Sequence, residues 1–213
     1  MKNYLAIDTS GDSLTVVAVK NGKTYERFIQ DCAMKHSVTL MNEIDDLLTK
    51  EGLSLNDFDF FACVVGAGSF TGIRIGISTV KGFASALKKP TLPVTSFDVL
   101  AYNGVDADEG KKTLCLVDAL HDSYYVCGYQ GGQVCVEPCY LTEEEVLALA
   151  KQGYTLRAGN VLPISEKVCV ERVSIAKGLC NATVALAEKQ AFGELAALYV
   201  RKSSAEINLG KGV

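Results

Sequence analysis

Short apolar runs separated by turn residues open the chain and indicate three strands. Asn21-Gly22 is the clearest turn signal between them, because both positions accept a positive φ. From His36 to Glu51 apolar residues recur at helical spacing, and Phe60–Val65 is a continuous apolar run that suits a strand buried on both faces. The first half is predicted to form strands 4–8, 14–20 and 23–30, helix 36–51, strand 60–65, helix 71–88, strand 91–95 and helix 96–102.

The second half again begins with strands and continues with helices. Residues 103–112 are polar and contain glycine, so they are the best candidate linker. Beyond them we predict strands 113–118, 123–130 and 133–136, helix 142–152, strands 155–158 and 167–170, and helix 178–190. This order predicts an α/β fold of two related lobes, an N-terminal lobe over residues 1–105 and a reduced C-terminal lobe over 106–213.

Composition narrows the class of protein. The chain has 213 residues, of which 48% are apolar and 22% charged, as in ordinary globular proteins. A net charge of −4 argues against a stand-alone nucleic-acid binder. Eight cysteines are too few for a disulfide scaffold, and Cys135 and Cys139 have no histidine or second cysteine pair beside them, so a zinc site is disfavoured. With no signal peptide and no membrane-length apolar run, we expect a cytoplasmic protein with free thiols and no membrane association.

The glycine-rich loop Gly66-Ala67-Gly68-Ser69-Phe70-Thr71-Gly72 follows a buried strand and precedes a helix, a place where backbone N–H groups can receive an anion. Its spacing fails the dinucleotide fingerprint, because the third glycine comes one residue late, and it lacks the lysine of a P-loop. Gly72 and Gly76 lie four residues apart and leave one helix face bare. We therefore favour helix–helix packing on this face, inside the fold or between subunits, over anion binding.

Serine catalysis fits poorly. Ser69 directly follows a glycine and precedes Phe70, so the G-x-S-x-G pattern of a nucleophile elbow is absent. Asp118, His121 and Ser123 are too close in sequence to converge across a site and are better explained as a turn. The two histidines, His36 and His121, have no metal-binding spacing.

Asp8 stands at the end of the first predicted strand and is followed by Thr9 and Ser10. By analogy at the level of fold, this is where sugar kinases, heat-shock proteins and actin hold a phosphate and its metal. The matching hairpin of the second half, residues 117–123, has no glycine, so its side chains would keep a phosphate away. We therefore predict a degenerate nucleotide cleft, with weak candidate residues Asp8, Thr9, Ser10, Gly68 and Ser69.

Several segments together resemble the TsaB (YeaZ) family. They are Leu5 to Ser10, His36-Ser37, Gly66 to Gly76 and Lys81-Gly82, with looser likeness at Val117-Asp118-Ala119 and Leu198 to Lys202. The resemblance covers about the first 105 residues well, and the glycine loop is its specific motif.

The resemblance implies a two-lobed actin-like ATPase fold and a non-catalytic platform for a TsaD-like catalytic partner. Together with a TsaE-like ATPase, that partner installs threonylcarbamoyladenosine in tRNA, which this chain would meet only through the complex. The chain would have no cofactor of its own, and an adenine nucleotide would bind at the subunit boundary of the complex. When alone, the chain would form a homodimer. The implied interface lies on helices 36–51 and 71–88, at Met41, Ile44, Leu48, Gly72, Arg74, Ile75, Gly76, Thr79 and Phe83.

The chain departs from this family and its catalytic relatives at a few positions. The catalytic relatives carry two metal-binding histidines where Ser96 and Leu100 stand here, which favours the platform. The family usually has proline at the position of Ala67, and often an arginine and a glutamate after Asp118, where this chain has Leu120 and Ser123.

An accessory subunit is thus the leading hypothesis. An actin-fold ATPase or glycoprotease-like peptidase is the alternative, motivated by Asp8 and the glycine loop. An RNA-binding module is a third hypothesis. The chain has three basic pairs, Lys88-Lys89, Lys111-Lys112 and Arg201-Lys202. Their wide separation in the sequence argues that they are solvated surface residues instead.

Overall fold

The computed structural model describes residues 2–103 and 111–201. The first lobe is built on a five-stranded sheet of order β3-β2-β1-β4-β5. The first three strands form an antiparallel meander, and the last two run parallel to β1. The strands are β1 (Tyr4–Asp8), β2 (Leu14–Lys20), β3 (Lys23–Ile29), β4 (Phe60–Val64) and β5 (Thr91–Val94).

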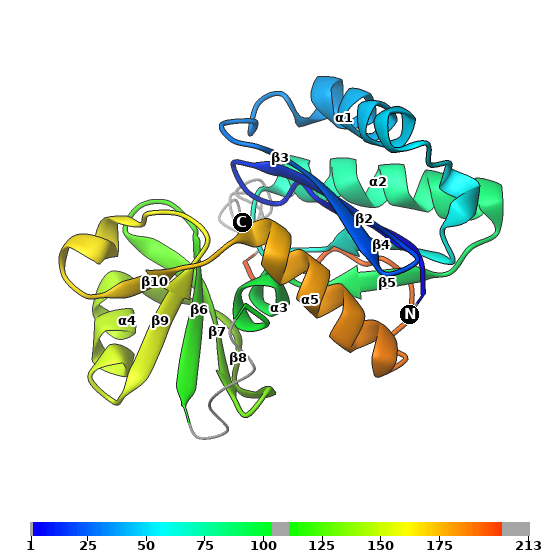
Figure 1. The fold of residues 1–213 in the computed structure, drawn as a ribbon. Coiled ribbons are helices and arrows are strands. Elements are labelled where there is room, and N and C mark those ends of the chain that lie inside the picture. Colours follow the sequence, from blue (N-terminus) through cyan, green and yellow to red (C-terminus); the bar gives the residue numbers. More distant parts are fainter. Residues whose placement is uncertain (1, 104–110, 202–213) are drawn as a thin grey trace, which may run out of the picture.

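Helices cover both faces of this sheet (Figure 1). Leu5 and Ile7 point into a core shared with α1 (His36–Glu51) and α2 (Phe70–Leu87). Tyr4 and Ala6 point the opposite way, into a core shared with α5 (Ile175–Glu188). Burial of alternate residues on opposite faces explains why β1 is apolar throughout. A short turn of helix, η1 (Leu55–Asp57), precedes β4.

The second lobe repeats this topology. Its sheet has the order β10-β9-β6-β7-β8, in which β6, β7 and β8 form the meander and β9 and β10 add parallel strands. The fold is therefore the expected actin-like arrangement of two related α/β lobes. The remaining elements are β6 (Lys112–Asp118), β7 (Ser123–Gln130), β8 (Gln133–Thr142), α4 (Glu143–Ala150), β9 (Tyr154–Ala158), η2 (Pro163–Glu166) and β10 (Val170–Arg172).

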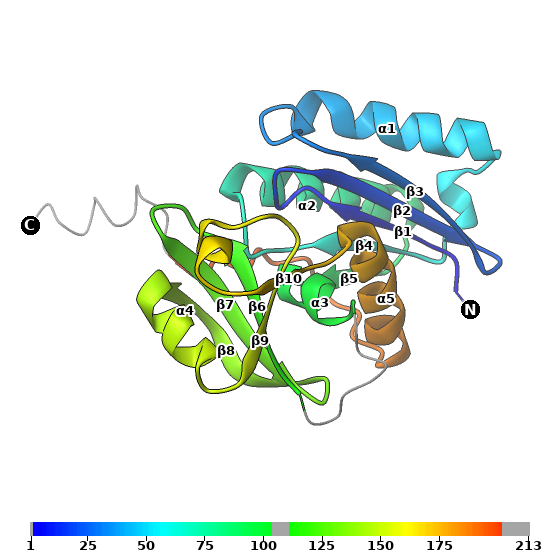
Figure 2. The ribbon, with the colours of Figure 1, turned by 60° about the vertical axis from the view of Figure 1, so that its left-hand side comes forward.

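The two lobes meet at α3 (Ser96–Ala101), as Figure 2 shows. Phe97 and Leu100 of this helix are buried against Cys115 and Cys127 of the second sheet. Arg157 of β9 adds a polar link, because its Nη1 donates to the carbonyl of Ala101 at 3.0 Å. The same guanidinium is held by Glu171 at 2.8 Å, so the end of α3 is fixed to the second lobe.

The chain returns to the first lobe after β10, which the division at residue 105 does not anticipate. Helix α5 packs on the first sheet, and Leu195 beyond it is buried in the core under α1 and α2. The second lobe as a packed unit is therefore the sheet from β6 to β10 with α4 and η2. Most of the predicted linker, residues 104–110, lies outside the described residues.

Most predicted boundaries are close to the observed ones, with three differences. Strand β8 continues to Thr142, six residues beyond the prediction. The predicted strand 167–170 lies further along, at Val170–Arg172. Helix α5 begins at Ile175, because the Ser174 hydroxyl accepts the N–H of Lys177 and caps it. Gly178, the predicted start, lies inside the helix, where an added Cβ would clash with the carbonyl of Val99.

Candidate functional site

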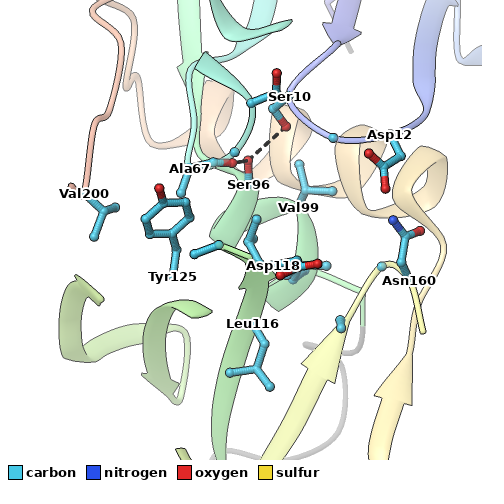
Figure 3. A pocket seen from close by; sticks show the side chains of 18 of the residues that line it. Ser10, Asp12, Ala67, Ser96, Val99, Leu116, Asp118, Tyr125, Asn160 and Val200 are labelled. Atoms are coloured by element: carbon cyan, nitrogen blue, oxygen red, sulfur yellow. Dashed lines mark hydrogen bonds between the residues drawn. The ribbon is translucent and has the colours of Figure 1, made fainter. Parts of the chain in front are cut away.

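A cleft of about 640 Å³ separates the lobes and is lined by both (Figure 3). The first lobe contributes the end of β1, the glycine loop and α3. The second contributes the turn between β6 and β7 and the loop after β9. Asp12 and Asn160 lie at one end of the cleft, and Tyr125 and Val200 at the other.

Asp8 lies at the inner wall of this cleft and is 6% exposed. Its Oδ1 accepts hydrogen bonds from the backbone N–H and the hydroxyl of Ser10, at 2.8 and 2.7 Å. Burial raises the pKa of the Asp8 carboxyl, and the two bonds from Ser10 and the nearby His36 offset this only in part. Burial thus disfavours the charged form of the Asp8 carboxyl, and its Oδ1 is paired within its own turn by Ser10.

A chain of hydroxyls extends from Asp8 across the base of the cleft. The Oγ atoms of Ser10 and Ser96 are 3.1 Å apart, and Ser96 Oγ donates to the carbonyl of Ala67 at 2.5 Å (Figure 3). This network joins β1, α3 and the glycine loop. Ser96 and Leu100 hold the two positions where the catalytic relatives were expected to carry histidines. Leu100 is buried in the core between the lobes, so this place is filled by packing and hydroxyl bonds.

The glycine loop is closed onto the turn that follows β1. The backbone N–H of Ser69 donates to the carbonyl of Ser10 at 2.7 Å. Gly68 has a φ of +148°, and an added Cβ there would clash with that same carbonyl. The Ser69 hydroxyl accepts the N–H of Gly72 at 3.2 Å and so caps α2. The N–H groups of Ser69 and Gly72 are thus paired within the lobe. Of the predicted nucleotide-cleft residues, Asp8, Ser10, Gly68 and Ser69 line the cleft, whereas Thr9 is buried against α2.

The bare glycine face of α2 packs on Thr9. An added Cβ at Gly72 would clash with the carbonyl of Thr9, and one at Gly76 would lie 2.6 Å from Thr9 Oγ1. The Thr9 hydroxyl itself donates to the carbonyl of Gly72 at 2.7 Å. The predicted helix–helix packing is therefore corrected: the glycines let the end of β1 approach α2.

The turn between β6 and β7 uses three consecutive residues with positive φ, Leu120, His121 and Asp122. Asp118 Oδ1 accepts the N–H of Leu120 at 2.8 Å, and the Ser123 hydroxyl donates to the carbonyl of His121 at 3.1 Å. The carboxylate and the hydroxyl thus stabilise the turn itself. Asp118, His121 and Ser123 do not form a chain of side-chain hydrogen bonds among the described contacts.

The predicted interface residues separate into accessible and buried ones. Met41 and Arg74 are exposed, and Ile75, Thr79 and Phe83 are half-buried. Ile44, Leu48, Gly72 and Gly76 are buried inside the lobe, so their place in the interface is corrected: they support the helices from below. Two apolar residues that the predicted interface did not include, Met34 and Val38, are 95% and 71% exposed.

His36 begins α1, as predicted, and is 1% exposed. Its Nε2 lies 3.0 Å from the carbonyl of Gly11, which anchors the turn after β1 to this helix. Within the described residues, no three His, Cys, Asp or Glu side chains are grouped to hold a metal ion. In the same part of the chain, no helix has the length and hydropathy needed to cross a membrane.

Comparison with known proteins gives a consistent result. The family model described as "TsaD: tRNA N6-adenosine threonylcarbamoyltransferase" matches residues 30–208. "tRNA threonylcarbamoyladenosine biosynthesis protein TsaB" of Escherichia coli is 32% identical over 126 residues, which are 59% of this chain and 54% of that protein. The protein of the same name from Bacillus subtilis is 33% identical over 100 residues, 47% of this chain and 44% of that protein. The chain thus spans about half the length of the curated relatives it matches.

A solved structure from Pseudomonas aeruginosa, described as an uncharacterized protein with similarity to peptidase YEAZ, superposes with a TM-score of 0.78. The two chains are 24% identical, and the superposition covers 94% of this chain and all of that chain. The likeness therefore shows a shared fold. The fold and the matched family model define the class, the TsaD-related proteins of actin-like fold. Within that class, the chain belongs to the TsaB (YeaZ) family.

Proposed function

We propose that this chain is a non-catalytic accessory subunit that binds a TsaD-like catalytic partner in the modification of tRNA to threonylcarbamoyladenosine. The single observation that carries the proposal is the closed cleft wall, in which Ser10, Ser96 and Ala67 bond to one another where a catalytic relative needs free ligands. The E. coli and B. subtilis relatives are named for threonylcarbamoyladenosine biosynthesis, which supports the same process here.

The partner binds, in this proposal, to a surface formed by Met34, Val38 and Met41 with Arg74 and Thr79, the α1–α2 surface. Its three apolar side chains recur every three or four residues and are 95%, 71% and 50% exposed. Val38 and Met41 lie on α1 and Met34 lies in the turn that precedes it. Large apolar side chains that are exposed close together in this way favour a protein interface. Arg74 of α2 adds a side chain of the kind enriched among residues that dominate binding energy.

The same surface serves a second copy of the chain when the partner is absent. A TsaE-like ATPase and tRNA are reached only through the complex. In this proposal an adenine nucleotide of the complex binds at the boundary with the partner, since the N–H groups of Ser69 and Gly72 are already paired within this lobe. We propose no cofactor resident in this chain.

Val38→Glu and Met41→Glu test the docking surface, because a charge there must be desolvated on binding. Each should weaken the affinity for the TsaD-like subunit of the same organism at least a hundredfold, measured by calorimetry, and abolish co-purification. Val161→Glu is the matched control, since Val161 is a 74% exposed valine of the second lobe. Wild-type affinity in both α1 variants would refute the proposed surface. ATP turnover by the isolated chain that Asp8→Ala abolishes would favour the ATPase instead.

A further inference from the structure

The segment Leu198–Arg201, the C-terminal strap, follows α5 and passes along one end of the cleft. The backbone N–H of Leu198 donates to the carbonyl of Val65 at 2.7 Å, where β4 ends and the glycine loop begins. Leu198 and Val200 pack against the core between the lobes. The strap therefore touches the two lobes at the junction that sets their relative position.

The strap is anchored to the first lobe by an aromatic stack on α2. The ring of Tyr199 stacks on Phe70 with centroids 4.4 Å apart and planes 21° from parallel. The guanidinium carbon of Arg74 lies 3.9 Å from the Phe70 centroid, and Arg74 Nε donates to the Tyr199 hydroxyl at 3.0 Å. This arrangement holds the strap to the first turns of α2, and it includes Arg74 of the α1–α2 surface.

The anchor on the second lobe is Tyr140 of β8. Arg201 Nη1 donates to the Tyr140 hydroxyl at 3.2 Å, and the guanidinium carbon lies 4.7 Å from the ring centroid. Tyr140 pairs directly across the sheet with Tyr125, which lines the same end of the cleft. A single residue, Val200, thus separates Tyr199, anchored on the first lobe, from Arg201, anchored on the second.

We infer that Leu198–Arg201 is a clasp between the lobes, which fixes the width of the cleft and is coupled through Tyr199 and Arg74 to partner docking. The anchors at Arg74 and Arg201 are solvent-exposed contacts of a kind that is individually weak, so they can release without unfolding either lobe. The coupling rests on the proposed function, since a partner seated on Arg74 meets the same side chain that holds Tyr199. The clasp itself does not depend on a partner.

The clasp is tested in the isolated full-length chain with Tyr199→Ala and Arg201→Ala. Tyr199→Ala should speed hydrogen exchange of the Leu198 amide at least tenfold and increase the radius of gyration in X-ray scattering. Arg201→Ala should increase the radius while leaving Leu198 exchange close to wild type, because the first anchor remains. Phe28→Ala, an exposed aromatic on the edge strand β3, is the control and should change neither. An unchanged radius in both strap variants would overturn the clasp, whatever happens to exchange at Leu198.

The coupling is tested by affinity for the TsaD-like subunit. Arg201→Ala and Tyr140→Phe remove the hydrogen bond of the second anchor from opposite sides, and both residues lie off the α1–α2 surface. Each should weaken docking at least threefold, and the double variant no more than Arg201→Ala alone, because that substitution already removes both the hydrogen bond and the cation–π contact. Wild-type affinity in both overturns the coupling while docking stands. If the wild-type chain does not bind the subunit at all, the proposed function fails, and the clasp is judged on the isolated chain.

Discussion

The hydroxyl of Thr9 donates to the carbonyl of Gly72 at 2.7 Å, which joins the end of β1 directly to the first turn of α2. Thr9 is fully buried, and the helix comes this close only because Gly72 and Gly76 have no side chains. A feature that looks like an open surface in the sequence is therefore part of the interior of the lobe.

Gly72→Ala should destabilise the protein by about 1–3 kcal/mol, because the added methyl group forces β1 and α2 apart. Gly82→Ala is the control in the same helix, since an added Cβ there meets nothing within 4 Å. It should stabilise the protein by up to about 1 kcal/mol through helix propensity. Urea denaturation measures both, and equal effects of the two substitutions would contradict the buried role of the glycine face.

Asp8→Asn should gain stability relative to wild type as the pH rises from 4 to 7. The folded pKa of Asp8 is raised above the unfolded value of about 3.9, chiefly by burial, so wild-type folding binds a proton and is weakened as pH rises through this range. Urea denaturation at several pH values provides the test.

Glu145→Gln should lose stability relative to wild type as the pH rises, which is the opposite of Asp8→Asn, so it serves as a control for the pH series. Bonds from the backbone and hydroxyl of Thr142 lower the pKa of Glu145. The stability that the wild-type carboxylate contributes is present above its unfolded pKa and is lost as pH falls through the lowered value. A gain with rising pH that is the same for both substitutions would refute the assignment to Asp8.

Ser10→Ala and Ser96→Ala should each cost about 1–2 kcal/mol, because each leaves a buried polar group with one partner fewer. A double-mutant cycle should give a coupling energy of about 0.5–1.5 kcal/mol between the two sites. Additive effects would mean that the hydroxyl chain across the cleft base is not a connected network.

Arg157→Met should destabilise the protein by about 2–3 kcal/mol, because it removes a buried cation from the carbonyl of Ala101 and the carboxylate of Glu171. Glu171→Gln should cost less than about 1 kcal/mol, since the Glu171 side chain is 49% exposed. Thermal unfolding measures both. Equal losses of stability would mean that Arg157 contributes through the ion pair with Glu171 and not through its hydrogen bond to Ala101.

The local pattern predicts the elements well where one face of each element is buried. The limits of α1, His36–Glu51, are those of the predicted helix, because Leu40, Ile44 and Leu47 repeat at helical spacing along its buried face. Strands β1, β2 and β4 agree within a residue, since turn chemistry at Asn21-Gly22 and a continuous apolar run define them. Periodicity alone does not show which other element covers a face.

That limitation explains the two main differences between the contacts that the sequence predicts and those in the structure. The stripe of Gly72 and Gly76 predicts a close approach, but only the fold shows that Thr9 makes it. The tail residues Tyr199 and Arg201 carry no periodic signal, so their contacts with Phe70 and Tyr140 follow from the return of the chain to the first lobe.

The return of the chain from the second lobe to the first also affects the order in which the core of the first lobe can form during synthesis. One face of the first sheet is covered by α5, whose Leu179 and Ala182 pack on Tyr4 and Ala6. A nascent polypeptide thus exposes this apolar face until α5 has left the ribosome, because the residues that cover it are synthesised after those of both sheets. The first 105 residues therefore leave one face of their sheet uncovered until the second lobe, which precedes α5 in the chain, has also been synthesised.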